Sequence, residues 1–164
     1  MDNTSQQVLV REGWKENRMV IREMELSCLE DIKPIIREVF SQSPWNEDWS
    51  DERQLNEYLL DLTVVRNVLI YGLYEKEELI GVSIGRIKHW CRGTEYYIEE
   101  LFIRNGFQGR GCGRAFFSLI EKELEKRDIH QIYLMTDRNQ PAYGFYQTIG
   151  FTELPELTSF FKEF

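Results

Sequence analysis

The chain has 164 residues, of which 42% are hydrophobic and 29% charged, a balance that predicts one globular domain and excludes wholesale disorder. The 28 acidic and 20 basic side chains give a formal net charge of −8 at pH 7. This acidity disfavours nucleic acid as a partner, because phosphates need Lys and Arg, and it suits a cationic ligand. No apolar run approaches the length of a membrane-spanning helix, so we expect no membrane partner.

The cysteine and histidine content argues against a metal site. Cys28, Cys91 and Cys112 stand far apart, and only two histidines are present. This pattern predicts reduced thiols in a cytoplasmic protein that needs no metal. The N-terminus also lacks the basic and apolar regions of a signal peptide, which favours the same localisation.

In chain order, the hydrophobic pattern predicts a loose polar extension over residues 1–17 and a single domain over 18–164. The expected strands cover residues 18–24, 68–74, 79–90, 94–103, 131–136, 151–153 and 158–164. The expected helices run from a cap at Ser27 or Asp31 to Phe40, from Ser50-Asp51-Glu52, which supplies an N-cap and acids, along a stripe of Leu55, Tyr58, Leu59 and Leu62, from the glycine-rich stretch to Arg127, and from Pro141 to Thr148. Pro34 fits only the first turn of its helix. Strands first and strand–helix–strand last predict a mixed α/β sheet.

A glycine-rich loop joins a predicted strand to a predicted helix, with the sequence Gln108-Gly109-Arg110-Gly111-Cys112-Gly113-Arg114. Glycines let the backbone approach a ligand closely, and the helix N-terminus adds positive potential, so the loop predicts a pyrophosphate cradle. The alternative is a flexible loop that ends in a helix cap. No Gly-Lys-Ser/Thr closes the loop as in a P-loop, and the third glycine of a dinucleotide fingerprint is missing.

This loop resembles the acyl-CoA signature of the GNAT superfamily of N-acetyltransferases, in which Gln or Arg leads a Gly-x-Gly pair. Residues 99–103 resemble the fourth strand of that family, and residues 139–151 resemble its second motif. The resemblance covers roughly residues 18–155. It implies a mixed, mostly antiparallel, twisted sheet of about six to seven strands flanked by about four helices, with acetyl-CoA as cosubstrate and no metal.

The same resemblance implies where acetyl-CoA binds. The residues implied are Leu101, Phe102 and Ile103 along the pantetheine arm, the amides of Gln108, Gly109, Arg110, Gly111, Cys112, Gly113 and Arg114 around the pyrophosphate, and Asn139, Tyr143 and Tyr146. Of these, Tyr146 would stand near the thioester sulfur and donate a proton to it. The alternative for Tyr146 is a core aromatic residue.

Acetyl transfer to an amine needs a group that accepts the amine proton, since an alkyl amine with a pKa of about 10 is mostly protonated at pH 7. Glu99 is the candidate base. Strict alternation places Glu95, Tyr97 and Glu99 on one face of their strand and Glu100 on the other, and a bulge would disturb this parity. Tyr97 stands where many members of the family carry a glutamate. The alternative is that these acids only attract a cationic substrate.

Two other functions stay open at this point. The segment Gly81-Val82-Ser83-Ile84-Gly85 matches the nucleophile elbow of α/β-hydrolases, but an apolar strand continues where that motif needs a turn into a helix. A non-catalytic acyl-CoA sensor would share the glycine loop, although Tyr146 argues against this reading.

The expected acceptor site is acidic and aromatic. Its candidate residues are Trp45, Asp48, Trp90, Glu95, Tyr97, Glu99, Glu100 and Asp137. Carboxylates around one pocket repel each other, and a multiply charged cation offsets that repulsion. Residues 84–90 and 99–103 also resemble aminoglycoside 6'-N-acetyltransferases, which implies an aminoglycoside as acceptor. A polyamine or a peptide amine is the alternative, and a homodimer stays open as the assembly.

Overall fold

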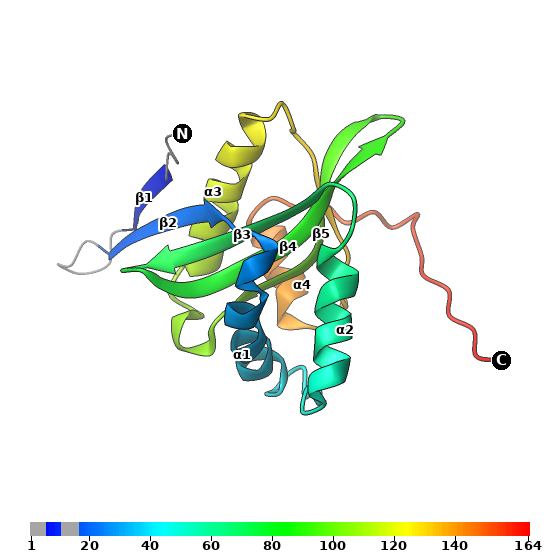
Figure 1. Cartoon of the computed structure of the whole chain (residues 1–164). Coiled ribbons are helices and arrows are strands. Elements are labelled where there is room, and N and C mark those ends of the chain that lie inside the picture. Colours follow the sequence, from blue (N-terminus) through cyan, green and yellow to red (C-terminus); the bar gives the residue numbers. More distant parts are fainter. Residues whose placement is uncertain (1–5, 11–16) are drawn as a thin grey trace.

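The computed structural model describes residues 6–10 and 17–164, in which one twisted sheet lies between two groups of helices (Figure 1). The sheet has six strands in the order β1-β2-β3-β4-β5-β6. The strands are β1 (Gln6–Val10), β2 (Asn17–Glu23), β3 (Val68–Glu75), β4 (Glu78–Trp90), β5 (Gly93–Ile103) and β6 (Ile132–Leu134). The helices are α1 (Leu29–Phe40), α2 (Glu52–Thr63), α3 (Cys112–Glu125) and α4 (Pro141–Thr148), with short 3-10 turns η1 (Leu26–Cys28) and η2 (Asn105–Phe107). The predicted mixed α/β fold is confirmed.

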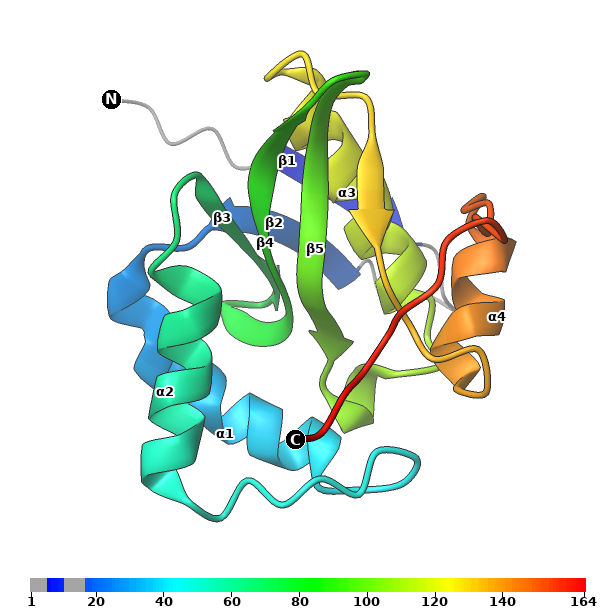
Figure 2. The same ribbon diagram turned by 90° about the vertical axis from the view of Figure 1, so that its right-hand side faces the viewer.

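The sheet divides the hydrophobic core into two parts. Neighbouring strands from β1 to β5 pair antiparallel, whereas β6 pairs with β5 in parallel. Helices α1 and α2 cover one face, and α3 and α4 lie on the other (Figure 2). The α1/α2 core includes Ile32, Ile36, Leu55, Leu59 and Phe102, and the α3 core includes Tyr96, Ile98, Phe116, Leu119 and Ile120.

Local chemistry explains the elements that the sequence predicted best. Asp51 caps α2, because its carboxylate accepts hydrogen bonds from the backbone N–H groups of Arg53 at 2.9 Å and Gln54 at 3.1 Å. The hairpin of β3 and β4 closes through Lys76 and Glu77, whose φ angles of 49° and 66° lie in the left-handed region that such tight turns require.

The N-terminal expectations need two corrections. Residues 6–10, expected in a loose extension, form strand β1 at the edge of the sheet, and residues 1–5 and 11–16 lie outside the described residues. Helix α1 begins at Leu29, so Pro34 lies inside it instead of in the first turn. The helix tolerates this proline because burial of its apolar stripe offsets the lost backbone hydrogen bond.

The strands expected at 151–153 and 158–164 are absent, since residues 149–164 contain no strand. Phe151 packs its ring on Phe117 at a centroid distance of 5.3 Å instead of joining the sheet. Further along, the side chains of Phe160, Phe161 and Phe164 are largely exposed. An apolar, β-favouring composition does not make a strand unless a sheet edge pairs with it.

The described part of the chain contains no membrane-spanning helix and no cluster of metal ligands. Within it, no helix combines the length and apolar character that crossing a bilayer demands. Among the same residues, no group of three or more His, Cys, Asp or Glu side chains is arranged to hold a metal ion.

Candidate active site

The centre of the candidate site is an irregularity in β5. Ile84 of β4 lies opposite Glu100, whereas the next residue, Gly85, lies opposite Ile98. Glu99 is therefore an extra residue in β5 and forms a β-bulge. A bulge bends its strand and changes which side chains share a face.

The bulge turns Glu100 toward α2. Tyr58 of α2 donates a hydrogen bond from its hydroxyl to Oε1 of Glu100. Phe102, two residues further on, is buried in the α1/α2 core, whereas Tyr96 before the bulge is buried under α3. Strict alternation put Glu100 on the face opposite Tyr97, and this expectation is wrong because the bulge resets the parity.

Gly85 makes room for the bulge on the neighbouring strand. A Cβ at this position would lie 2.4 Å from the carbonyl oxygen of Tyr97 and 2.7 Å from a ring carbon of Tyr96. Both distances are shorter than a van der Waals contact, so the two strands approach this closely only because residue 85 lacks a side chain.

Next to the bulge, β5 and β6 separate. The two strands pair only at Tyr96–Ile132, Tyr97–Tyr133 and Ile98–Leu134. Beyond these pairs β5 continues to Ile103, and no described strand lies along its β6 side, as Figure 2 shows. The predicted pantetheine residues 101–103 therefore follow the point of separation, with free strand edge available to a ligand.

The glycine loop follows β5 and leads into α3. Gly109 and Gly111 have φ angles of +72° and +80°, and a Cβ at either position would meet no atom within 4 Å. Gly111 caps α3 without any side-chain hydrogen bond to the first turn. Open space above glycines and a helix N-terminus without a side-chain cap fit a pyrophosphate, as the sequence predicts.

The side chains of the loop serve different purposes. Gln108 donates a hydrogen bond from Nε2 to the carbonyl oxygen of Ile103 at 2.8 Å, which ties the loop to the end of β5. Arg110 lies with its guanidinium 5.2 Å above the ring of Phe107 and 3.9 Å from Glu75.

Three further residues of the loop pack against the body of the protein. Arg114 donates to the carbonyl oxygen of Thr148 at 3.2 Å, close to the end of α4. Cys112 is buried in the α3 core. Gly113 lies against Phe145, since an added Cβ would come within 2.9 Å of Cζ. These contacts fix the first turn of α3 next to α4.

Glu100 belongs to an acidic and aromatic cluster. The rings of Trp49 and Tyr58 lie 4.7 Å apart, and Trp49 donates from Nε1 to Oε2 of Glu47 at 2.6 Å. Burial, together with the negative charges of Glu47 and Glu99, raises the pKa of Glu100 from 4.5 to about 7, while the Tyr58 hydrogen bond acts in the opposite direction. A carboxylate with this pKa can accept and release a proton at neutral pH.

Tyr146 of α4 is set among aromatic rings. The centroids of Phe117, Phe145 and Phe151 lie 5.9, 5.5 and 5.5 Å from that of Tyr146. Burial first, and the charge of Glu100 second, raise the pKa of Tyr146 to about 12. The hydroxyl therefore keeps its proton near neutral pH and can donate it, and it lies within the electrostatic range of Glu100.

Glu99 has a different partner. Its Oε1 lies 3.2 Å from a guanidinium nitrogen of Arg86, and the same guanidinium lies 5.4 Å from the ring centroid of Tyr97. Tyr97 in turn stacks on Tyr133 of β6 at 5.2 Å, at the point where the two strands are still paired.

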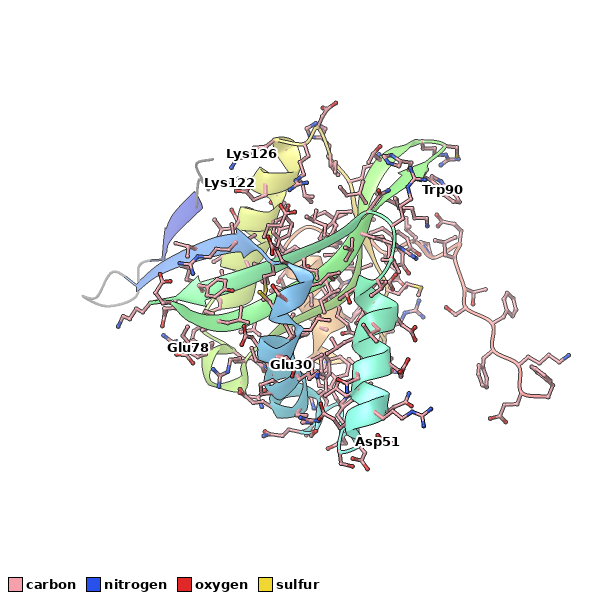
Figure 3. The ribbon with its side chains drawn as sticks, viewed as in Figure 1. Glu30, Asp51, Glu78, Trp90, Lys122 and Lys126 are labelled. Atoms are coloured by element: carbon pink, nitrogen blue, oxygen red, sulfur yellow. The ribbon has the colours of Figure 1, made fainter. Side chains whose placement is uncertain are left out.

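Two predicted acceptor residues lie at the far end of the β4–β5 hairpin. Figure 3 shows Trp90 at this tip, remote from Asp51 at the start of α2. The ammonium of Lys88 lies 4.9 Å above the Trp90 ring and 3.6 Å from Glu95. The structure thus groups Trp90 with Glu95 and does not bring them to Glu100.

The remaining predicted residues make local contacts. Trp45 packs edge-on against Phe40 at 5.7 Å, in the α1/α2 core. Asp48 accepts a hydrogen bond from the backbone N–H of Ser50 at 3.0 Å. These two residues stabilise the segment between α1 and α2.

Residues before and within α4 also make local contacts. Asp137 accepts from the backbone N–H of Asn139 at 2.8 Å and so shapes the turn that precedes the helix. Tyr143 donates its hydroxyl proton to Glu153 at 2.8 Å, and Arg138 pairs with the same carboxylate.

Sequence reasoning missed the partner of Glu100. Tyr58 was assigned only to the apolar stripe of α2, together with Leu55, Leu59 and Leu62. A hydroxyl on a stripe that faces the core needs a hydrogen-bond partner, and this was the available signal. Trp49, not Trp45, supplies the aromatic ring beside it.

The hydrolase reading is excluded by the environment of Ser83. This residue lies in the middle of β4, is fully buried, and shares a hydrogen bond of 2.9 Å with the hydroxyl of Tyr96. No strand-to-helix turn presents it to a substrate, as a nucleophile elbow would.

Comparisons with known proteins agree with this geometry. The model of the Acetyltransferase (GNAT) family matches residues 29–151. The chain is similar to Histone acetyltransferase TAP1 from Glycine max, at 32% identity over 82 residues, which are 50% of this chain and 33% of that protein. The matched part is thus about a third of that curated relative.

Two solved structures share the fold. The aminoglycoside acetyltransferase meta-AAC0020 from an uncultured soil metagenomic sample gives a TM-score of 0.66 at 16% identity, covering 89% of this chain and 96% of that one. A predicted acetyltransferase from Clostridium acetobutylicum, solved with acetyl-CoA, gives 0.66 at 15% identity, covering 87% and 95%. At these identities the likeness establishes the fold alone.

Proposed function

The chain belongs to the GNAT acetyltransferase family, and on this premise we propose that it is an N-acetyltransferase that acetylates a primary amine of a cationic small molecule. The observation that carries the proposal is Glu100. Its carboxylate has a pKa of about 7, and it stands at the bulge where β5 leaves β6. This is a proton acceptor placed beside the predicted acetyl-CoA path.

Glu100 is assigned as the general base of the reaction. The acceptor amine arrives mostly as an ammonium ion, and a neutral nucleophile forms when a carboxylate takes its proton. The sequence pointed to Glu99 for this role. We assign the base to Glu100 instead, because the Glu99 carboxylate already has the guanidinium of Arg86 as a partner at 3.2 Å.

The donor site is assigned to the free edge of β5 and to helices α3 and α4 beside it. Bound acetyl-CoA supplies an acetyl group activated as a thioester. The amides of Gly109 to Gly113 hold phosphate at the start of α3, and the main chain of residues 101–103 holds the arm. Tyr146, protonated at neutral pH, donates its hydroxyl proton to the departing sulfur.

The acceptor class follows from the charge of the cluster. The negative charges of Glu47 and Glu99 oppose the ionisation of Glu100, and a bound polycation relieves this repulsion. The rings of Trp49 and Tyr58 offer π-faces to ammonium groups. Aminoglycosides are the first class to test, and a solved aminoglycoside acetyltransferase shares the fold. Polyamines carry the same kind of charge.

A peptide or protein amine is the second candidate. It is favoured by the similarity to a histone acetyltransferase, which covers half of this chain. A peptide N-terminus carries a single positive charge and gains less from three carboxylates than a polycation does.

A thiol-release screen tests the function. Purified protein and acetyl-CoA are mixed with kanamycin, spermidine or a peptide amine, with and without a chelator. We expect turnover of the polycations that weakens as salt is added and is unaffected by the chelator. Turnover of the peptide alone would overturn the assignment of the acceptor, and acetyl-CoA binding without turnover of any amine would indicate a sensor.

A further inference from the structure

The contact between Tyr58 and Glu100 joins two elements that are far apart in the chain. The Tyr58 hydroxyl donates to Oε1 of Glu100, and this bond leaves Oε2 of the same carboxylate to accept a proton from elsewhere. Burial and the charge of Glu100 raise the pKa of Tyr58, so the tyrosine stays the donor throughout the physiological range. The tyrosine is therefore the donor whenever Glu100 is ionised.

The tyrosine is itself held in place. Leu55 and Leu59, on the same stripe of α2, are fully buried, which anchors the helix on the sheet. The Trp49 ring covers the Tyr58 ring at 4.7 Å, and the Trp49 N–H is bonded to Glu47 at 2.6 Å. The buried helix and the Trp49 ring thus restrict the Tyr58 side chain to an orientation in which its hydroxyl donates to Glu100.

The hydrogen bond from Tyr58 counteracts the negative charges around Glu100. Glu47 from the α1–α2 segment and Glu99 from β5 both oppose ionisation of Glu100, as does its burial. Tyr146 from α4 is neutral at pH 7. Among the groups that face Glu100 from these elements, the Tyr58 hydroxyl favours the ionised carboxylate.

We propose that Tyr58 is a positioning residue for the acetyl transfer, one that fixes the orientation of the Glu100 carboxylate and favours its ionised form. The inference rests on the proposed role of Glu100 as base. A hydrogen bond to a charged group favours the charged form by about tenfold or more. Without the hydroxyl, the base is present but mostly protonated.

The first test does not depend on activity. Glutamate labelled with ¹³C at the side-chain carboxyl is incorporated, and the Glu100 resonance is assigned by its loss in Glu100→Gln. Its titration is then compared between the wild type and Tyr58→Phe, which keeps the ring beside Trp49 and removes the donor. We expect a higher pKa of Glu100 in the variant. An unchanged pKa overturns the proposal.

Kinetics provide the second test, with the best amine from the thiol-release screen. For Tyr58→Phe we expect kcat/KM to fall about tenfold at pH 6 and by less than about twofold at pH 9, because the lost base is restored as pH rises. An equal loss at every pH indicates a structural role and overturns the proposal. Tyr58→Leu, which fits the apolar stripe, repeats the test if Tyr58→Phe does not fold.

Two controls separate this inference from the proposed function. Tyr74→Phe removes a hydroxyl from β3, where the ring faces Arg22, and we expect the wild-type pH profile. Glu100→Gln removes the base itself. If the fall of kcat/KM toward acidic pH is the same in Glu100→Gln as in the wild type, Glu100 is not the base. If this part of the pH profile changes in Glu100→Gln but not in Tyr58→Phe, only the role of Tyr58 is refuted.

Discussion

The carbonyl oxygen of Tyr97 on β5 lies where a side chain at Gly85 on β4 would begin, at 2.4 Å from the Cβ position. A backbone atom cannot move aside as the end of a side chain can. The contact therefore links the identity of residue 85 to the course of β5 at the bulge, and so to the direction of Glu100.

We expect Gly85→Ala to destabilise the protein by about 2–3 kcal/mol, because the added methyl group forces β4 and β5 apart. Urea unfolding followed by circular dichroism measures the change. Gly106→Ala is the matched control, since a Cβ there meets no atom within 4 Å, and its free energy of unfolding should change by less than about 0.5 kcal/mol. Equal stabilities of the two variants would contradict the close approach.

The glycine loop can be tested by charge at constant shape. Gly111 has a φ of +80°, a conformation that Asp and Asn tolerate similarly. Gly111→Asp places a negative charge at the start of α3, where we place phosphate, so we expect its affinity for CoA to fall about tenfold below that of Gly111→Asn. Titration calorimetry with CoA measures both. Equal affinities would show that the phosphates bind elsewhere.

Tyr146→Phe removes the proposed acid and keeps the ring that packs on Phe117. Since the pKa of Tyr146 is about 12, the hydroxyl is protonated over the whole working range of the enzyme. We expect kcat to fall about 10- to 100-fold, with the Kd for CoA changed less than about twofold. Stopped assays and calorimetry measure the two. A loss confined to CoA affinity would assign Tyr146 to binding alone.

The raised pKa of Glu100 also predicts how the stability of the folded protein depends on pH. Its pKa rises from 4.5 to about 7 in the folded protein, so ionising it costs more in the folded than in the unfolded chain. The native state loses stability from this group as pH rises from about 4.5 to 7. Glu100→Gln should therefore be more stable than the wild type by about 1–3 kcal/mol at pH 8 and equal to it at pH 4. Thermal unfolding at both pH values is the measurement, and a variant less stable at pH 8 would refute the raised pKa.

How much the sequence predicted depends on how local the cause is. The start of α2 at Ser50-Asp51-Glu52 and the glycine loop before α3 depend on a few neighbouring residues, and both lie where the pattern predicted them. The bulge at Glu99 depends on Gly85 in another strand, and the partner of Glu100 is 42 residues away. Alternation within one strand cannot report such contacts.

The C-terminal segment also shows that a local pattern cannot report contacts with distant parts of the chain. Residues 158–164 have the composition of a strand, but a strand also needs an edge to pair with, and composition does not report which edges are available. The α1–α2 segment carries two tryptophans, and its composition does not report that Trp45 turns into the core whereas Trp49 turns to Tyr58.

The division of the core by the sheet has a consequence for how such an enzyme changes over evolutionary time. The proposed base, its tyrosine partner and the acidic cluster rest on the α1/α2 core, whereas Tyr146 and the start of α3 rest on the α3 core. Substitutions more than about 7–10 Å apart combine nearly additively, so those on the α1/α2 side that lie this far from Tyr146 and from the start of α3 affect them little. Substitutions on the α1/α2 side can therefore change the preference for one amine over another, while the residues proposed to bind the acetyl donor stay unchanged.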